Sequence, residues 1–356
     1  MRRPPTLLVT GGAGYIGSHV VAQLGARGER ILVLDNLSTG RARAVLHGRL
    51  VVGDIGNKHL LRALFQEYRI ETVLHFAARI VVPESVAKPL EYYDSNTARA
   101  RTLLAESSRA GVDQFIFSST AAVYGDLSGG QANEDSPTAP LNPYGRSKLM
   151  TEWMLNDLSA VSSMRHVILR YFNVAGCDGM GRLGQDTPEA THLIKVACEH
   201  AVGLRPDLEI FGTDYPTPDG TCVRDYIHVE DLAAAHLNAL DYLRAGGESL
   251  TANCGYGHGF SVREVIDALG RVHGQALKVR ESGRRAGDMA SIVANSNLIR
   301  KRLGWQPTRD DLDLILSSAL AWESQGLDRK TIQGPVPASA ASVWRGQAAA
   351  SPRPSH

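Results

Sequence analysis

Short apolar runs alternate with longer amphipathic segments along the first half of the chain. The apolar runs predict buried strands at Thr6–Thr10, Ile31–Asp35, Leu50–Gly53, Thr72–Phe76, Gln114–Ser118 and Val167–Tyr171. The segments between them predict helices at Tyr15–Arg27, Lys58–Tyr68, Leu90–Ala110 and Pro143–Leu158. Strands this apolar leave no face for solvent, and their alternation with helices is typical of a parallel sheet covered on both sides. We therefore predict an α/β fold with a Rossmann-type, doubly wound parallel sheet.

The second half is less regular and is rich in Gly, Pro and Asp between residues 176 and 225. Its pattern predicts a strand at Tyr226–Val229 and helices at Asp231–Leu243 and Ser261–Val272. We expect residues 1–172 to form the Rossmann domain, with 226–257 returning to it. Residues 173–225 and 258–326 would form a smaller C-terminal α/β domain. From Leu327 the composition turns to Ala, Ser, Pro and Gly, which predicts a disordered tail over 327–356.

Charge and hydropathy narrow the class of protein. The 38 basic and 37 acidic side chains nearly cancel to a formal charge of +1, so no electrostatic attraction to nucleic acid is expected. No apolar run reaches the ~20 residues that a membrane-spanning helix needs, and no cleavable apolar signal follows Met1. We expect a soluble, cytoplasmic protein without a nucleic-acid or membrane partner.

The cysteines and histidines do not follow a metal-binding pattern. Cys177, Cys198, Cys222 and Cys254 are widely spaced, and the 12 histidines include no His-Glu-x-x-His sequence. The cysteines are therefore expected to pack as small apolar side chains in a reducing compartment. No metal site is predicted.

A glycine cluster directly follows the first predicted strand. Gly11, Gly14 and Gly17 lie at the junction with the helix that begins at Tyr15. Glycines here permit a tight turn, let a pyrophosphate approach backbone N–H groups, and let the helix pack closely on the strand. The helix N-terminus then offers unpaired donors to the phosphates. This context favours a dinucleotide site over an ordinary tight turn.

Acidic residues after the second and third strands extend this prediction. Asp35 ends the second strand, where a carboxylate can accept hydrogen bonds from both hydroxyls of an adenosine ribose. The same carboxylate would repel the 2′-phosphate of NADP, so we predict NAD, although Arg41 and Arg43 could weaken that preference. The segment Gly53-Asp54-Ile55 is interpreted either as an adenine contact or as a turn with a helix cap.

Residues 142–148 (Asn-Pro-Tyr-Gly-Arg-Ser-Lys) carry the candidate chemistry. Asn142 can cap a helix whose first turn accommodates the following proline, which places Tyr144 and Lys148 one turn apart on one face. The lysine ammonium and a positively charged nicotinamide would favour the phenolate and lower the pKa of Tyr144. Ser118 and Thr120 stand at the C-terminal end of a predicted strand, which faces the ligand crevice in such folds. Together these residues predict a Ser/Thr–Tyr–Lys oxidoreductase triad.

Several longer segments match one known family. They are Thr10–His19, His75–Ala78, Pro83–Val86, Ser118–Gly125, Pro143–Lys148, Arg170–Asn173, Phe211–Thr217 and Asp219–Val229. With them the chain resembles the extended short-chain dehydrogenase/reductases (NAD-dependent epimerase/dehydratase family) and, more narrowly, the UDP-glucose 4-epimerases. The glycine and Tyr/Lys motifs are typical of the superfamily, whereas Asp219–Val229 is much more specific. The resemblance covers about residues 6–320.

The resemblance implies a role for each matching residue. Thr120, Tyr144 and Lys148 would be catalytic. NAD would be held by Gly11, Gly14, Tyr15, Ile16, Gly17, Asp35, Asn36, Asp54, Ile55, Phe76, Ala77, Ala78, Ser118, Tyr144, Lys148 and Phe172. A UDP-sugar would contact Thr120, Tyr144, Asn173, His192, Leu193, Phe211, Arg224, Arg285, Asp288 and Ile292, so the smaller domain is expected to bind the nucleotide sugar.

The resemblance also implies the reaction. Tyr144 would take the proton of the sugar 4-hydroxyl while a hydride passes from C4 to NAD. The 4-keto sugar would turn over in the site and receive the hydride on its opposite face, so NAD is regenerated and stays tightly bound. The implied enzyme is an isomerase of galactose metabolism that interconverts UDP-glucose and UDP-galactose. The resemblance also implies a homodimer.

Some alternatives stay open. Ile292 lies at the position that sets sugar size in the family and is of intermediate size. The substrate could therefore be a UDP-N-acetylhexosamine or a UDP-pentose, and Ile292 could equally be an ordinary packed residue. Ser95 and His192 each stand where relatives often have asparagine.

The sequence is less consistent with two rival functions. A 4,6-dehydratase is disfavoured because Ala121-Ala122 after Thr120 can neither donate nor accept a proton. A non-catalytic NAD-sensing protein on the same fold is the alternative of another class, and the intact Tyr144/Lys148 pair argues against it.

Overall fold

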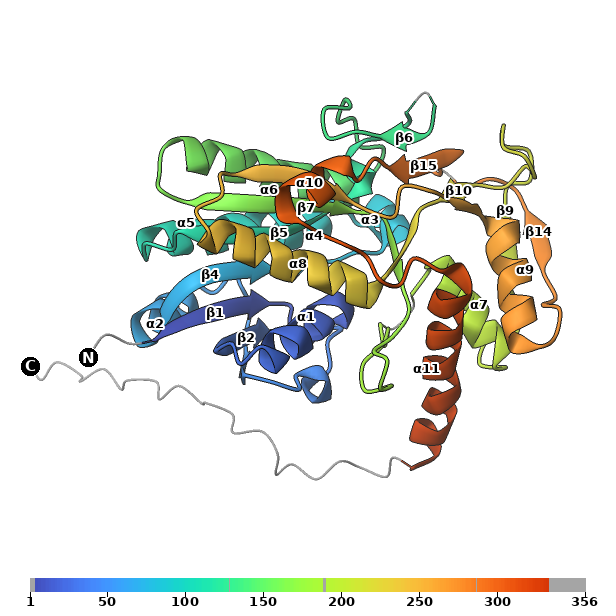
Figure 1. Ribbon diagram of the computed structural model, residues 1–356, viewed down its shortest axis with the longest axis horizontal. Coiled ribbons are helices and arrows are strands. Elements are labelled where there is room, and N and C mark those ends of the chain that lie inside the picture. The colour runs from blue at the N-terminus through green and yellow to red at the C-terminus, as the bar shows by residue number, and fades with distance from the viewer. Residues whose placement is uncertain (1–3, 128, 188–189, 286, 333–356) are drawn as a thin grey trace, which may run out of the picture.

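A seven-stranded parallel sheet forms the centre of the computed structural model, which describes residues 4–127, 129–187, 190–285 and 287–332. The strand order is β12-β7-β5-β4-β1-β2-β3, so the order reverses between β1 and β4 (Figure 1). The strands are β1 Pro5–Thr10, β2 Ile31–Asp35, β3 Arg49–Val52, β4 Arg69–His75, β5 Gln114–Thr120, β7 Arg165–Tyr171 and β12 Leu250–Cys254. All their pairings are parallel. The predicted doubly wound sheet is confirmed.

Alternate side chains of each strand face opposite layers of helices. Leu7 and Val9 of β1 pack with α1 (Tyr15–Ala26) and α8 (Val229–Arg244). Leu8, between them, packs with α2 (Lys58–Glu67), α5 (Arg99–Arg109) and α6 (Pro143–Ala160). Burial on both faces is the reason that these strands are apolar throughout.

The single helix predicted at Leu90–Ala110 is divided in the structure. A short helix α4 (Pro89–Tyr92) leads into one π-helical stretch, η2 (Tyr93–Ala98), and then into α5. A further short helix, α3 (Val82–Ala87), comes before them and lies outside the predicted elements. The wider π turn changes which side chains face inward, and such turns are frequent at functional sites.

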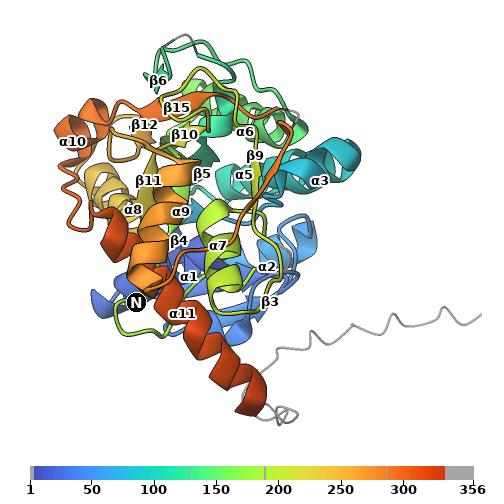
Figure 2. The same cartoon turned by 90° about the vertical axis from the view of Figure 1, so that its right-hand side faces the viewer.

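Smaller elements gather at one end of the central sheet (Figures 1 and 2). A four-stranded sheet has the order β13-β10-β15-β6, built from Phe260–Ser261, Val223–Arg224, Ser291–Ala294 and Gln131–Ala132. Two strand pairs accompany it: β8 (Asn173–Ala175) with β11 (Tyr226–His228), and β9 (Glu209–Phe211) with β14 (Arg280–Ser282). The helices α7 (Leu193–Ala201), α9 (Val262–His273) and α11 (Leu312–Ile332) pack together, and α10 spans Asn297–Leu303. Single turns of 3₁₀-helix, η1 (Ala42–Ala44) and η3 (Ala121–Val123), follow β2 and β5.

The last helix corrects one boundary. α11 continues to Ile332, past Leu327, where the predicted disordered tail begins. The Leu, Arg and Lys residues at its end are good helix formers, which explains why the helix does not stop where the composition changes. The rest of the predicted tail, 333–356, lies outside the described residues. Within the described ranges, no helix is both long and apolar enough to cross a membrane.

The parallel strands all end at one edge of the sheet, and polar residues stand there. Thr10, Asp35, His75 and Thr120 are the last residues of β1, β2, β4 and β5. In open α/β sheets this edge is where ligands bind. The candidate site is therefore built outward from these strand ends.

Candidate active site

The turn after β1 is formed by backbone that a side chain would obstruct. Gly11 has a φ of +72°, and a Cβ added there would lie 2.5 Å from the Ala77 nitrogen. Gly14 stands at the N-cap of α1, and because it has no side chain it leaves the N–H donors of the first turn uncapped. Uncapped donors at a helix N-terminus suit a pyrophosphate. These residues fit the predicted NAD site.

Asp35 is held in place by the backbone of the glycine turn. Its Oδ2 accepts a hydrogen bond from the Ala13 N–H at 2.9 Å, and its Oδ1 accepts one from the Leu37 N–H at 2.8 Å. Each carboxylate oxygen has a second lone pair that can accept from a ribose hydroxyl. Burial raises the pKa of Asp35, and the two backbone hydrogen bonds oppose that shift.

Asp54 forms the turn that one of the two interpretations predicted. Its Oδ1 accepts from the Gly56 N–H at 2.7 Å, and its Oδ2 receives the Arg99 guanidinium at 2.6 Å. The helix cap of α2 is Asn57 rather than Asp54. Ile55 is buried in the core on that face of the sheet. The adenine contacts of Asp54 and Ile55 stay predictions.

The three predicted catalytic residues come together at the ends of β5 and α6. The Asn142 side chain caps α6 by accepting from the Gly145 N–H at 2.9 Å, which confirms the predicted helix start. Tyr144 and Lys148 are buried on α6, and the Thr120 side chain hydrogen-bonds the Tyr144 hydroxyl. The Lys148 ammonium donates a hydrogen bond to the backbone carbonyl oxygen of Ser118, in β5, at 2.8 Å.

Desolvation dominates the pKa values of this pair. Burial raises the pKa of Tyr144 to about 12, against a smaller lowering by the Thr120 hydrogen bond. Burial lowers the pKa of Lys148 to about 7. The sequence predicts a lowered pKa for the tyrosine, whereas the protein alone raises it, because neither charged form is hydrated in the interior. The positive charge of a nicotinamide is the influence that would act in the other direction.

One further turn along α6 lies a residue that the sequence reasoning missed. Glu152 is 1% exposed, and its carboxylate accepts from the Arg170 guanidinium at 2.5 Å. Ser119 also donates to it. The negative charge of Glu152 raises the pKa of Lys148 and so opposes the effect of burial. Tyr144, Lys148 and Glu152 are each four residues apart and so lie on one face of α6. This spacing is visible in the sequence and could have identified Glu152.

The π-helix supplies a second missed residue. Asn96, 2% exposed, points inward from η2, where the sequence analysis considered Ser95. Its side-chain amide accepts from the Arg79 N–H at 2.8 Å and donates to the Arg79 carbonyl at 2.9 Å. It also donates to the Ser147 hydroxyl of α6 at 3.1 Å.

The predicted cofactor wall and sugar gate lie in two different clusters. Phe76, after β4, packs its ring 4.8 Å from the His236 ring, centroid to centroid. Phe172, after β7, is buried in one apolar cluster with Ile292 of β15. Ile292 is thus a packed strand residue, and its role as a size gate stays a prediction.

Three predicted UDP-sugar contacts gather at the end of β9. The Arg285 guanidinium lies 4.6 Å from the centroid of the Phe211 ring, and its Nε donates to Asp288 at 3.0 Å. An aromatic ring, a cation and a carboxylate are groups that can bind the base, phosphate and ribose of a nucleotide.

The remaining predicted contacts stand on separate elements. Asn173 begins β8, and His192 and Leu193 lie at the start of α7. Arg224 of β10 pairs in register with Ile292 of β15. That these residues touch a nucleotide sugar stays a prediction.

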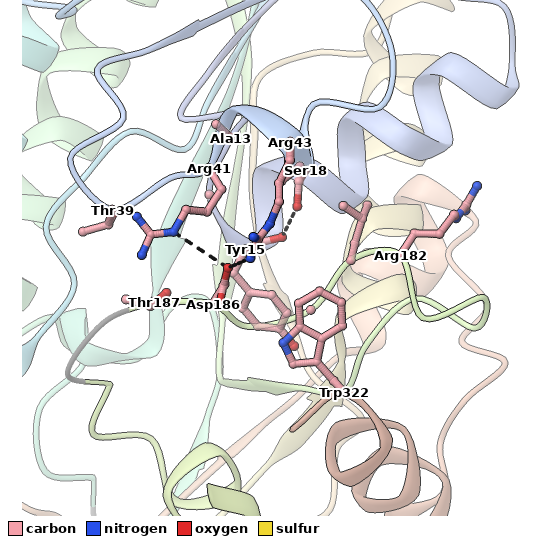
Figure 3. Close-up of a pocket in the computed structure, with 14 residues that line it drawn as sticks. Ala13, Tyr15, Ser18, Thr39, Arg41, Arg43, Arg182, Asp186, Thr187 and Trp322 are labelled. Atoms are coloured by element: carbon pink, nitrogen blue, oxygen red, sulfur yellow. Dashed lines mark hydrogen bonds and ion pairs between the residues drawn. The ribbon is translucent and has the colours of Figure 1, made fainter. Parts of the chain in front are cut away.

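A cleft opens beside the glycine turn (Figure 3). Asp186, in the segment before α7, accepts from the Arg43 guanidinium at 2.6 Å and lies 3.8 Å from Nε of Arg41. Tyr15 of α1 donates from its hydroxyl to the Gly176 carbonyl at 2.6 Å. These contacts join the loop after β2 and the start of α1 to the smaller elements across the cleft.

The comparison with known proteins decides the family. The sequence profile of the NAD dependent epimerase/dehydratase family matches residues 7–255. The chain belongs to this family. The predicted resemblance to this family is confirmed.

Its relatives match nearly the whole chain. The UDP-glucose 4-epimerase of Azospirillum brasilense is 55% identical over 339 residues, which cover 95% of this chain and 97% of the relative. The crystal structure of UDP-glucose 4-epimerase from Brucella ovis in complex with NAD is 42% identical with a TM-score of 0.87, covering 90% of this chain and 99% of its own. The UDP-Glc/GlcNAc 4-epimerase of Campylobacter jejuni is 48% identical with a TM-score of 0.80, covering 90% and 100%.

Proposed function

We propose that this family member is a UDP-glucose 4-epimerase, an isomerase that interconverts UDP-glucose and UDP-galactose with NAD retained in its site. The observation that carries the proposal is the buried Tyr144, hydrogen-bonded to Thr120 and one turn from Lys148, at the strand ends beside the glycine turn. The Azospirillum brasilense relative bears this name, and the Brucella ovis structure contains NAD. Both support the substrate and the cofactor.

The residues of the triad would divide the proton chemistry between them. Bound NAD supplies the acceptor, and then the donor, of the hydride at the sugar C4. Tyr144 takes the proton of the 4-hydroxyl and returns it, while Thr120 hydrogen-bonds the phenol and lowers its pKa. Lys148, anchored on the Ser118 carbonyl, supplies a positive charge near the phenolate.

We further propose how binding is divided along the chain. NAD would be held by residues 1–172 together with 226–257, and the UDP-sugar by 173–225 and 258–326. The uncapped N-terminus of α1 and the anchored Asp35 support the first part. The cluster of Phe211, Arg285 and Asp288 supports the second.

We propose a cytoplasmic homodimer that does not bind nucleic acid. Val86, Leu90 and Trp153 expose large apolar side chains on the neighbouring helices α3, α4 and α6, with Leu90 78% exposed and Trp153 54% exposed. Apolar side chains grouped in this way favour contact with a second copy. The near-zero net charge supports the absence of a nucleic-acid partner.

The test is product analysis without added cofactor. Purified protein is incubated with UDP-galactose, UDP-N-acetylgalactosamine and UDP-arabinose, and the products are separated and identified. UDP-glucose should form from UDP-galactose. Failure to convert any of the three sugars would overturn the proposal and support a non-catalytic NAD-sensing protein.

A second substrate class is supported by Ile292. The aliphatic side chain packs against Phe172 where relatives that exclude N-acetylated sugars tend to carry an aromatic ring, and the Campylobacter jejuni relative is named for both UDP-Glc and UDP-GlcNAc. Use of UDP-N-acetylglucosamine by the wild type and its loss in Ile292→Tyr, with UDP-galactose still converted, is the expected result. Equal loss of both activities would contradict the gate.

A further inference from the structure

A buried carboxylate stands where the chain passes from one small sheet to another. Asp225 lies between β10, which ends at Arg224, and β11, which begins at Tyr226, and it belongs to neither strand. β10 is part of the four-stranded sheet, whereas β11 pairs with β8. Asp225 is 0% exposed. It falls within Asp219–Val229, the more specific motif of the sequence, and the proposed function gives it no role.

Both oxygens of this carboxylate accept hydrogen bonds from backbone N–H groups of other segments. Oδ1 accepts from Tyr256, in the loop after β12, at 2.9 Å. Oδ2 accepts from Gly257 at 2.9 Å and from Ala294, the last residue of β15, at 3.2 Å. A carboxylate offers two acceptor oxygens and no donor, so it can satisfy three such N–H groups at once. The Asp225 side chain therefore ties the loop after β12 to β15.

The backbone of Asp225 is bonded to two neighbouring strands. Its carbonyl accepts from the Asn173 N–H of β8 at 3.0 Å, and its N–H donates to the Ile292 carbonyl of β15 at 3.4 Å. Arg224, the residue before it, pairs in register with Ile292. Three predicted contacts of the UDP-sugar, Arg224, Asn173 and Ile292, are therefore joined to this one residue by a peptide bond or a hydrogen bond.

Arg224 needs such support to bind an anion in a fixed geometry. In the part of the chain that the structure describes it forms no ion pair, and its Nη1 donates to the Val223 carbonyl at 2.9 Å. A guanidinium recognises phosphate oxygens through directional hydrogen bonds, so its position must be set closely. The strand that carries it, β10, has two residues. Its placement therefore depends on contacts such as those of Asp225.

We propose that Asp225 is a positioning residue for the UDP-sugar, which holds β8, β10 and β15 so that Arg224, Asn173 and Ile292 meet the substrate together. The inference rests on the proposed function, because these three residues must bind the nucleotide sugar. An amide in place of the carboxylate has one acceptor oxygen and one donor group, so at least one of the three N–H groups would lose its partner. The small strands would then shift, while α6 and the glycine turn would stay in place.

The first test is Asp225→Asn. KM for UDP-galactose should rise at least about tenfold, the size expected when hydrogen bonds to a buried charged group are lost. The Kd of UDP, measured by titration calorimetry, should rise by a similar factor. The kcat should stay within about threefold and the NAD content should not change, because the triad and the glycine turn are not bonded to Asp225.

The matched control is Asp231→Asn. Asp231 of α8 is 3% exposed and accepts from the N–H groups of Thr308 and Arg309 and from the Tyr256 hydroxyl. It is thus a similarly bonded buried aspartate, and none of these partners is a predicted substrate contact. Asp231→Asn should lower the melting temperature about as much as Asp225→Asn does, and it should leave KM within about twofold.

The outcomes separate positioning from stability alone. A KM that stays normal in Asp225→Asn, or rises equally in both variants, would overturn the inference. Wild-type turnover of UDP-galactose is measured first, and its absence would count against the proposed function instead. If Asp225→Asn does not fold, Gly255→Ala replaces it, because the added Cβ would lie 2.6 Å from Oδ2 of Asp225 and force the carboxylate to move. Its KM should also rise, and an unchanged KM in that variant would equally overturn the inference.

Discussion

Tyr144 and Lys148 show how one environment acts oppositely on an acid and a base. Burial raises the pKa of the phenol to about 12 and lowers that of the ammonium to about 7. Both shifts favour the neutral forms, because the interior hydrates neither charge. A reaction that needs the phenolate therefore depends on positive charge brought in with the ligand, on the hydrogen bond from Thr120 and on the protonated form of Lys148.

Loss of the Tyr144 hydroxyl should reduce turnover without affecting the binding of NAD. Tyr144→Phe keeps the ring but removes the proton carrier, so kcat is expected to fall by about 10² to 10⁴. NAD should remain bound, since the glycine turn and Asp35 are untouched. Product analysis gives kcat, and release of nucleotide from the denatured protein gives NAD content. Tyr68→Phe, just before β4 at the opposite edge of the sheet, should change neither; a Tyr144→Phe protein with normal turnover would disprove the assignment.

Lys148 makes stability depend on pH. Its pKa is about 7 when folded against 10.5 as the ordinary value. Between these two pH values the unfolded chain binds a proton that the native protein has released, so stability should rise with pH over this window. Relative to Lys148→Met, the wild type should gain on the order of 2 kcal/mol between pH 7 and pH 9 in urea unfolding. Parallel stability curves for the two proteins would rule out the shifted lysine.

At the level of single residues, the sequence predicted the triad but not the groups that hold it. Tyr144 and Lys148 form a short motif with a known chemical meaning. Glu152 and Asn96 bind partners that are distant in the chain, among them Arg170 and Arg79. No local sequence pattern predicts a contact between residues so far apart in the chain. The four-residue spacing of Glu152 from Lys148 is the one signal that the sequence contained.

At the level of elements, the apolar runs were sufficient for β1 to β5. The pattern is strong in β1, β2, β4 and β5, which are largely buried, whereas the edge strand β3 is partly exposed. The short strands β10 and β15 were not predicted, since two to four residues give no period and depend on partners far along the chain. α7 was missed as well, inside the region 176–225, whose glycines and prolines suggested loops, and β12 was missed further along the chain. The π-helix cannot be read from periodicity, because it interrupts the period of an otherwise normal helix.

The N-cap of α6 joins stability to catalysis in one element. Asn142→Ala removes the acceptor of the Gly145 N–H and should cost about 0.5–2 kcal/mol of stability. Because Tyr144 lies in the first turn, kcat should also fall. Asn57→Ala removes the equivalent cap of α2, which accepts from Leu60 at 3.1 Å, and should cost similar stability without loss of kcat. The stability of both variants is measured by urea unfolding, and their kcat by turnover. Equal kcat in the two variants would show that the cap of α6 does not affect catalysis.

At the scale of the whole molecule, the cleft in Figure 3 is bridged by charges from both sides. Asp186 meets Arg41 and Arg43 next to the glycine turn. The pairs are well exposed, with Arg43 51% and Asp186 42% exposed, so each contributes little to stability. Because they lie beside the predicted NAD site, we expect them to slow the release of the cofactor instead.

Breaking this bridge should loosen the cofactor rather than the fold. Asp186→Asn is expected to speed NAD release a few-fold while changing unfolding free energy by less than about 1 kcal/mol. Release is followed by trapping free NAD with an excess of a second NAD-binding enzyme. Asp313→Asn, at the exposed pair with Arg271, is the control and should change neither quantity. Unaltered NAD release in Asp186→Asn would mean that the bridge does not retain the cofactor.

The helix α6 has a consequence for how such a protein can change over time. This one helix carries Tyr144, Lys148 and Glu152 and packs against the central sheet. Phe211, Arg224 and Ile292 instead lie on strands of two to four residues outside that sheet. If these residues bind the sugar as proposed, substitutions in those strands would change the sugar preference without moving Tyr144 and Lys148. To change the sugar specificity, we would first replace the segments around β9, β10 and β15 with those of a relative and leave the rest of the chain unaltered.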